Sequence, residues 1–244
     1  MLTSKTNSFA IGAVAALLTA AGLYGQTQVP PLAETGFQSI FDGRTMNGWD
    51  GDTDFWRVEN GEMIGETKAD HQPKQNTFLI WRGGKPGDFE FKMQYKLTGP
   101  EANSGVQYRS VELPEVAKYV LKGYQADMDV AQTYTGQLYE ERNRGFVSLR
   151  GQIAYVPDGG KPGSVGSLGD SNVLKGFINA SDWNEIHIIA RGNTLIHIIN
   201  GHVMSVTVDD DKANRKMDGV IGVQLHVTKS GMKMEVKNIR IKQF

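Results

Sequence analysis

The sequence of 244 residues contains no cysteine at all. The protein can therefore form no disulfide, cannot carry a lipid on an N-terminal cysteine and cannot use a thiol as a nucleophile. A chain of this kind must rely on its hydrophobic core for stability. All-β domains often reach ~200–250 residues without dividing, so the chain is long enough for one well-buried β-sandwich.

The sequence also lacks an excess of charge of either sign. It has 26 Lys and Arg residues against 27 Asp and Glu residues, a formal net charge of -1. Nothing in this balance would attract a polyanion or an anionic membrane surface. We therefore expect no nucleic-acid partner.

Long amphipathic helices are missing as well, because nowhere do apolar residues keep a 3.6-residue period for more than about three turns. The one helix that the sequence predicts is short, over residues 114–122, where Pro114 suits a first turn. Residues 157–172, PDGGKPGSVGSLGDSN, are predicted to form a loop that is either functional or mobile. Their glycines do not have the spacing of a dinucleotide-binding loop.

What the sequence does contain is strand periodicity. Residues 88–97, DFEFKMQYKL, alternate apolar and polar without a break, as in a half-buried strand. Within residues 183–208, the pairs Gly192-Asn193 and Asn200-Gly201 predict two tight turns and hence a three-stranded meander. Residues 219–227 and 232–244 read as two further strands. With 29 glycines and closely spaced turns, the pattern predicts an all-β fold, a two-sheet antiparallel sandwich.

The N-terminus has the pattern of a secretory signal, with Lys5 ahead of an apolar run from Phe9 to about Leu23. A membrane anchor is the alternative, but a spanning helix needs ~20 apolar residues and this run is shorter. We predict a signal peptide at 1–25, a linker at 26–36 and a folded domain at 37–244. The product would be secreted or periplasmic, without stable membrane insertion after signal cleavage.

Residues 123–129, GYQADMD, place Gln125, Asp127 and Asp129 at alternate positions, so on a strand the three side chains share one face. Three polar side chains on one face are too many for a core. Sugar-cleaving sandwich enzymes of the laminarinase type carry a similar ladder that begins with a glutamate. Here the first position of the ladder is Gln125, an amide. A retaining glycosidase needs two carboxyl groups, so this residue does not suit that mechanism.

The order of several motifs resembles that of the 3-keto-disaccharide hydrolase family, long catalogued as a domain of unknown function. The motifs are FDGRTMNGWD, WRVENGEMIGE, NSGVQYRS, GYQADMD, TGQLYEE, DWNEIHIIARGN, NG, and VIGVQLHV before KNIRI. The similarity covers about residues 37–244. It implies a concanavalin A-like jelly roll and an exported enzyme that cleaves 3-keto-glycosides or 3-keto-disaccharides.

A ketone at carbon 3 makes the hydrogen on carbon 2 acidic, so the bond to the aglycone can break by elimination, and water can add afterwards. Such an enzyme needs a base, a group that stabilises the enolate and an acid for the leaving oxygen. It needs no carboxylate nucleophile. Gln125 in place of a glutamate is therefore compatible with this chemistry.

The residues that could supply these roles fall into two sets. We assign the base to Asp127, with His226 as the second candidate or as the acid, and enolate binding to Arg109. A buried Asp127–Arg109 pair with a structural role is the alternative. The predicted substrate-binding residues are Gln125 and Glu66, which would orient hydroxyl groups, and Trp81 and Tyr139, which would stack on a sugar ring.

No cofactor is predicted, although a divalent metal is left open. His197 and His202 are expected diagonally on one face of the meander, but two imidazoles without a carboxylate make a weak metal signal. Acidic residues of a loop, Asp50, Asp52 and Asp54, are candidates for a structural calcium site.

Two other functions remain open at this stage. A non-catalytic carbohydrate-binding sandwich would need only neutral donors, acceptors and stacking rings. A hydrolase of unoxidised glycosides is disfavoured by Gln125. In each case the expected partner is a sugar or glycoside.

Overall fold

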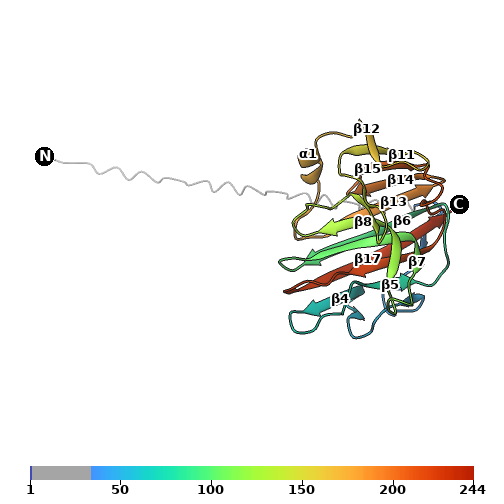
Figure 1. Ribbon diagram of the computed structural model, residues 1–244. Helices are drawn as coiled ribbons and strands as arrows, with labels where there is room; N and C mark the ends of the chain where they lie inside the picture. The colour runs from blue at the N-terminus through green and yellow to red at the C-terminus, as the bar shows by residue number, and fades with distance from the viewer. Residues whose placement is uncertain (2–33) are drawn as a thin grey trace. The chain divides into compact units, whose positions relative to one another are not determined.

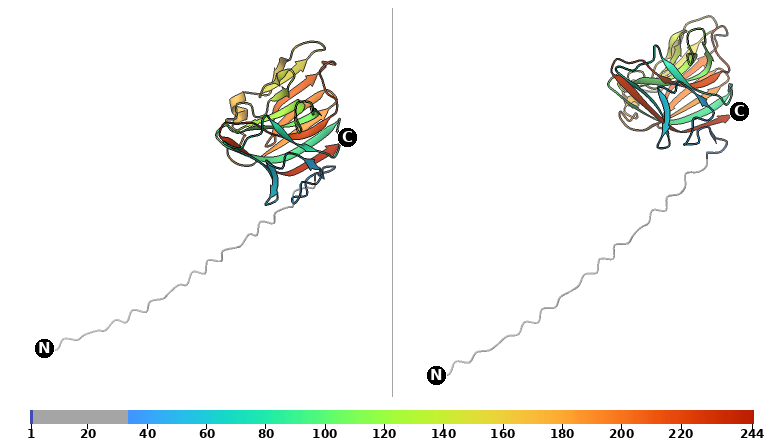
Figure 2. Two further views of the ribbon diagram at one scale, coloured as in Figure 1. Left: turned by 60° about the horizontal axis from the view of Figure 1, so that its bottom comes forward. Right: turned by 90° about the horizontal axis from the view of Figure 1, so that it is seen from below.

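Two β-sheets account for most of the regular structure in the residues that the computed structural model describes, Met1 and 34–244 (Figure 1). They lie face to face, as the further views in Figure 2 show. Every strand pair is antiparallel except β11 with β15. The predicted two-sheet antiparallel sandwich is thus confirmed.

The larger sheet contains the predicted meander and the C-terminal strand, with β1 (Gln38–Ser39) attached to β17. Its order is β12 (Gly163–Ser167), β11 (Gln152–Val156), β15 (His202–Asp209), β14 (Thr194–Ile199), β13 (Asn184–Arg191), β6 (Phe89–Thr98), β17 (Gly231–Gln243), β4 (Glu62–Lys68) and β3 (Trp56–Glu59).

The smaller sheet contains the polar ladder on β8. Its order is β10 (Gly145–Ser148), β9 (Leu138–Glu141), β8 (Leu121–Asp129), β7 (Asn103–Glu112), β16 (Val220–Leu225), β5 (Thr77–Trp81) and β2 (Trp49–Asp50).

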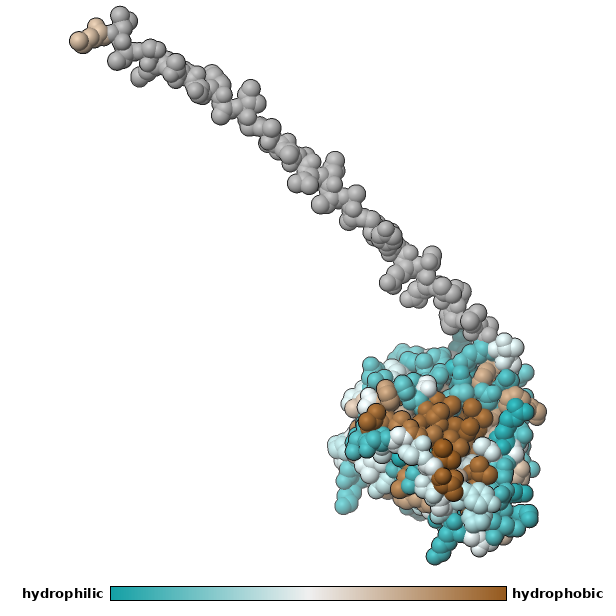
Figure 3. Space-filling view, turned by 90° about the horizontal axis from the view of Figure 1, so that it is seen from above, coloured by the Kyte–Doolittle hydropathy of each residue, from teal (hydrophilic) through white to brown (hydrophobic). Residues whose placement is uncertain are grey.

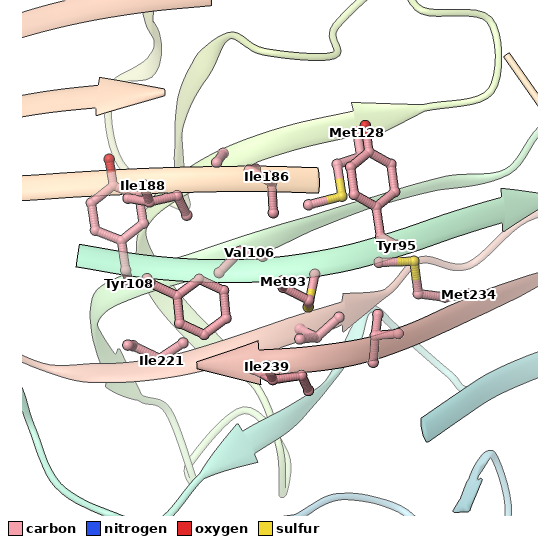
Figure 4. Close-up of a cluster of buried hydrophobic side chains, with 14 of the residues drawn as sticks. Met93, Tyr95, Val106, Tyr108, Met128, Ile186, Ile188, Ile221, Met234 and Ile239 are labelled. Atoms are coloured by element: carbon pink, nitrogen blue, oxygen red, sulfur yellow. The ribbon is translucent and has the colours of Figure 1, made fainter. Parts of the chain in front are cut away.

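The core lies between the two sheets, and strand alternation decides which side chains enter it. On β6 the predicted alternation is confirmed, because its apolar side chains are buried while the residues between them are partly exposed. Figure 4 shows Met93 and Tyr95 of this strand in one hydrophobic cluster with Val106, Tyr108 and Met128 of the smaller sheet. Burying a side chain of this size contributes ~1.5–3 kcal/mol, so this layer is a large stabilising contribution.

Both predicted tight turns are present. Arg191 pairs with Thr194 across Gly192-Asn193, and Ile199 pairs with His202 across Asn200-Gly201. Asn200 and Gly201 have φ of 50° and 81°, as a type I′ turn requires.

Two local predictions are wrong. Residues 114–120 form turns and no helix, because Glu112 and Leu121 pair as the ends of β7 and β8, so the segment closes a hairpin. The predicted loop at 157–172 supplies the edge strand β12, which pairs with β11. It leads into the short helix α1 (Ser171–Lys175), whose first turn is capped by Asp170.

The compact unit of the structure spans Thr35–Phe244. The predicted signal peptide and most of the linker lie outside the described residues, so both stay predictions. Among the described residues, no helix has the length and hydrophobicity to cross a membrane. Figure 3, seen from the side on which β12 and α1 lie in Figure 1, shows a hydrophobic patch surrounded by polar surface.

Candidate active site

The polar ladder on β8 faces away from the core, as the alternation predicts. Met128 is fully buried in the inter-sheet core, whereas Asp127 on the opposite face lines a cavity. The third rung, Asp129, is structural. Its carboxylate accepts backbone N–H bonds from Thr133, Tyr134 and Thr135, which shape the loop after β8.

The cavity has a volume of about 320 Å³ and lies at one end of the smaller sheet. The register brings its walls together, because Gly105 pairs with Asp127 and Gln125 pairs with Tyr139 across neighbouring strands. Its lining residues are Asn76, Asn103, Gln125, Asp127, Tyr134, Tyr139, Glu141, Phe146, Gln224 and His226.

Three glutamines hold Asp127 in place. Gln125 Nε2 donates to Asp127 Oδ1 at 2.7 Å. Gln125 Oε1 in turn accepts from Gln107 Nε2 and Gln224 Nε2, each at 3.2 Å. The amide of Gln125 is therefore fixed in the orientation that donates to Asp127, and Asp127 Oδ2 is the oxygen left for a proton.

Gln224 adds an acceptor to the cavity wall. Its Oε1 is buried and has no hydrogen-bond partner within the described structure. An unpaired buried acceptor costs ~1–3 kcal/mol. A ligand hydroxyl that enters the cavity can remove this cost by donating to Gln224.

Burial makes Asp127 a carboxyl group that keeps its proton near neutral pH. Removal from water raises the pKa of Asp127 to about 8, against the lowering effect of the Gln125 hydrogen bond. The negative charges of Asp129 and Glu141 raise this pKa further. Burial also raises the pKa of Glu141, although the charges of Arg142 and His226 oppose the shift.

His226 is held as the tautomer with a proton on Nδ1. Nδ1 lies 2.7 Å from the backbone oxygen of Val227, which can only accept, so Nδ1 is the donor. Nε2 of the neutral ring then carries the lone pair. Two backbone hydrogen bonds fix the loop that follows β16. Val227 N–H donates to Asn76 Oδ1 at 3.0 Å, and Thr228 N–H donates to Gln72 Oε1 at 3.3 Å.

Aromatic rings form the wall of the cavity towards β10. Phe146 stacks on Tyr134 with ring centroids 5.6 Å apart and meets Tyr139 edge to face at 5.1 Å. Tyr134 and Phe146 are 40% and 44% exposed. Exposed rings of this kind suit the apolar face of a sugar or a planar aglycone.

Of the residues predicted for the site, the structure brings together Gln125, Asp127, Tyr139 and His226. Arg109, Glu66 and Trp81 do not line this cavity.

Arg109 is displaced by a β-bulge. The register between β7 and β8 shifts after Tyr108, and Arg109 itself has φ of 47°. Its buried guanidinium donates to the backbone oxygens of Gly87, Gly192 and Lys216 and pairs with Asp88. The alternative of an Asp127–Arg109 pair is therefore wrong. Arg109 instead connects the segments that contain Gly87, Gly192 and Lys216 through hydrogen bonds.

The other two predicted residues lie on different surfaces. Glu66 is on β4 of the larger sheet and forms an ion pair with Arg57 at 2.7 Å. Trp81 on β5 is 6% exposed and belongs to the hydrophobic core cluster.

Sequence reasoning missed Asn76, Glu141, Phe146 and Gln224, and for Glu141 and Gln224 the sequence held a signal. The motif TGQLYEE alternates so that Tyr139 and Glu141 share a face of β9, and VIGVQLHV places Gln224 two residues before His226. These spacings could have identified both residues as neighbours of the predicted site. The strand order that brings β9 and β16 to the two sides of Asp127 could not be predicted from them.

Both histidines considered for metal binding, and Asp50 among the acidic candidates, have other partners. His197 is buried, lies 2.9 Å from the Tyr108 hydroxyl, and burial lowers its pKa to about 4. His202 stacks on Phe177 at 3.5 Å between ring centroids. Asp50 pairs with Arg82 at 2.9 Å. Within the described residues no three His, Asp or Glu side chains are grouped as metal ligands.

Residues 36–242 match the model of the family described as the 3-keto-alpha-glucoside-1,2-lyase-like domain. A 3-keto-disaccharide hydrolase of Bacteroides thetaiotaomicron is 25% identical over 183 residues, which cover 68% of this chain and 57% of that protein. The match thus spans little more than half the length of this relative.

Solved structures share the fold. A candidate glycosyl hydrolase from Parabacteroides distasonis has a TM-score of 0.56 at 17% identity, covering 86% of this chain and 94% of that one. The carbohydrate-binding module CBM66 from Bacillus subtilis has a TM-score of 0.52 at 12% identity, covering 80% and 96%. A Bacillus subtilis protein with a galectin-like fold also has a TM-score of 0.52, at 11% identity, covering 81% and 90%.

Proposed function

This chain belongs to the 3-keto-alpha-glucoside-1,2-lyase-like family, as its motif order predicted, and from that premise we propose that it cleaves 3-keto-glycosides by elimination followed by hydration. One observation carries the proposal. A single cavity holds a carboxyl group that keeps its proton near neutral pH, Asp127, and an imidazole whose Nε2 carries the lone pair, His226. These are the acid and the base that elimination requires.

The division of roles supported by these contacts is the reverse of the one expected from the sequence. His226 Nε2 takes the proton from carbon 2, while protonated Asp127 donates to the oxygen that leaves carbon 1. Glu141, whose pKa is coupled to the charge of His226, stabilises the imidazolium that forms. Because Val227 N–H fixes Oδ1 of Asn76 as the acceptor, Nδ2 is the end that donates to the enolate oxygen.

Water then adds across the double bond between carbons 1 and 2. Ionised Asp127 takes a proton from the water that attacks carbon 1, and the His226 imidazolium returns a proton to carbon 2. Both side chains recover their starting protonation states. The products are the free 3-keto sugar and the released alcohol.

A second candidate function rests on Glu141. Asp127 and Glu141 line the same cavity, so a pair of carboxyl groups is present despite Gln125. Such a pair could hydrolyse an unoxidised glycoside, with Asp127 as the acid. The two functions differ in whether the ketone is required.

The test uses a glycoside and its 3-keto derivative, incubated with the purified domain in heavy water. We expect cleavage of the keto derivative alone, with deuterium at carbon 2 of the released sugar by NMR. The control is the free 3-keto sugar kept in heavy water without enzyme, since protons beside a ketone exchange slowly unaided. Equal cleavage of both glycosides would refute elimination, and deuterium at carbon 2 would support it, because the His226 imidazolium can exchange its proton with heavy water before it returns one to carbon 2.

We also propose that the enzyme acts outside the cytoplasm, in the periplasm or the medium. The support is the signal pattern in residues 1–25. N-terminal sequencing of the exported protein checks it, and a mature product that still begins at Met1 would contradict signal cleavage.

A further inference from the structure

A second cavity of about 260 Å³ meets the catalytic cavity at Phe146, which lines both. It lies between β10, the turn that follows it, and the edge strand β12. Its lining residues are Phe146, Val147, Ser148, Leu149, Gln152, Pro162, Gly163 and Ser164. None of these side chains carries a charge.

Each polar side chain of this second cavity makes at least one hydrogen bond within the protein. Gln152 Oε1 accepts from the Leu149 N–H at 3.0 Å. Ser148 Oγ accepts from Thr207 at 3.0 Å, and Ser164 Oγ donates to the Gly166 oxygen at 3.1 Å. What the cavity offers to a ligand is the apolar surface of Phe146, Leu149 and Pro162, together with polar surface that includes the Nε2 amide of Gln152.

The order of strands sets the direction in which the leaving group departs. Asp127 on β8 stands between the aromatic wall on β9 and β10 and the base His226, which follows β16. The base must reach carbon 2 while the acid reaches the oxygen on carbon 1. A sugar placed in this way directs its carbon 1 oxygen away from His226 and towards Phe146.

We propose that Phe146 and the second cavity form the leaving-group subsite of this enzyme, and that the subsite takes an uncharged aromatic aglycone. The proposal rests on the function proposed above, because the direction follows from Asp127 as acid and His226 as base. A flat ring can stack on Phe146 with an offset or edge contact, which is favourable beyond the area that it buries.

A second sugar fits this subsite less well than an aromatic ring. Each buried hydroxyl needs a hydrogen-bond partner, and among the side chains of this cavity Gln152 Nε2 is the main donor that remains. The larger cavity, of about 770 Å³, is different because Asp52, Lys74 and Lys118 are among its lining residues. It meets the catalytic cavity at Asn76, on the side of the base, where the leaving group does not go.

The experiment measures kcat/KM for three substrates that share one 3-keto sugar and differ in the leaving group: phenol, methanol or a second glucose. Phe146→Ala should lower the ratio of phenyl to methyl kcat/KM about tenfold, the equivalent of 1.4 kcal/mol. The ratio of disaccharide to methyl should change by a smaller factor. A general loss of activity cancels within each ratio. The intrinsic reactivity of each leaving group cancels when the ratio of a variant is compared with the ratio of the parental enzyme.

Phe177→Ala is the matched control, since Phe177 is also exposed, at 39%, and also stacks on a ring, that of His202. It should leave all three ratios at the parental values. Gly163→Leu is the second variant. A Cβ there meets no atom within 4 Å, so leucine can fill the subsite without strain and should also reduce the phenyl to methyl ratio.

The outcomes separate the two proposals. If the parental enzyme cleaves none of the keto substrates, the proposed function fails, and the subsite fails with it. If it cleaves them but neither variant changes the phenyl to methyl ratio, the leaving group lies elsewhere and only the subsite is refuted. An equal or larger change for the disaccharide would overturn the assignment of an aromatic aglycone.

Discussion

The pH dependence of catalysis separates the two possible roles of Asp127. Burial and the neighbouring carboxylates raise its pKa from 3.8 to about 8. If Asp127 is the acid, the active enzyme is the protonated form. We then expect kcat/KM to fall as pH rises through about 8, approaching a tenfold loss per pH unit on the alkaline side.

Three variants test whether this decrease in kcat/KM near pH 8, the alkaline limb of the pH profile, reports the ionisation of Asp127. Asp127→Asn removes the proton donor and should lower kcat/KM by ~10²–10⁴-fold, with no limb near pH 8. Glu141→Gln removes a charge that raises the Asp127 pKa, so the limb should move to lower pH in the activity that remains. Gln125→Met removes the hydrogen bond that lowers this pKa, so the limb should move to higher pH.

The assay follows release of the alcohol from a 3-keto-glycoside between pH 5 and 10, with the enzyme-free rate subtracted at each pH because keto sugars eliminate slowly in base. A kcat/KM that rises through pH 8 would restore Asp127 as the base, the role first assigned from the sequence. A profile that is unchanged in the Glu141 and Gln125 variants would show that the limb reports some other group.

Three further predictions concern stability and positioning. A carboxyl with a raised folded-state pKa destabilises the protein as pH rises from about 4 to 8, so Asp127→Asn should raise the unfolding free energy by on the order of 3 kcal/mol near pH 7 and little at pH 4; equal stability at both pH values in denaturant titrations would contradict this. Arg109→Met leaves the backbone oxygens of Gly87, Gly192 and Lys216 without their donor, so it should cost on the order of 3 kcal/mol of stability and leave kcat/KM of the folded protein unchanged; a selective loss of kcat would return Arg109 to the site. Asn76→Asp keeps the acceptor for Val227 N–H but replaces the amide donor by a negative charge, so kcat should fall at least tenfold with the thermal midpoint nearly unchanged; a parental kcat would exclude Asn76 as the enolate donor.

The sequence predicted those features of the site that depend on alternation within one strand. Gln125 and Asp127 were placed correctly on the polar face of β8, because the alternating residues Tyr124, Ala126 and Met128 have apolar bodies and enter the core. The same reasoning placed the meander and its two turns. Local chemistry decides such features, and it can be read without knowledge of the partner strand.

The predictions that failed depended on events outside a single strand. Arg109 lies two residues after Gln107 and would share its face in a regular strand, but the bulge and the positive φ turn it away. Trp81 was predicted to stack on a sugar, but it packs in the core. A large aromatic side chain suits either environment, so the residue type alone could not distinguish them. Glu141 reaches Asp127 only through the pairing of β9 with β8.

The fold alone does not decide between an enzyme and a binding module, since a carbohydrate-binding module and a candidate glycosyl hydrolase have TM-scores of 0.52 and 0.56 against the same chain. The decision rests on what the cavity contains. A sugar-binding site gains nothing from a carboxyl group buried among three glutamines, because a neutral amide would offer similar hydrogen bonds without the cost of ionisation. Asp127 is held in this costly environment, with the imidazole of His226 and the carboxyl group of Glu141 on the walls of the same cavity. That arrangement favours proton transfer at a bound sugar over binding alone.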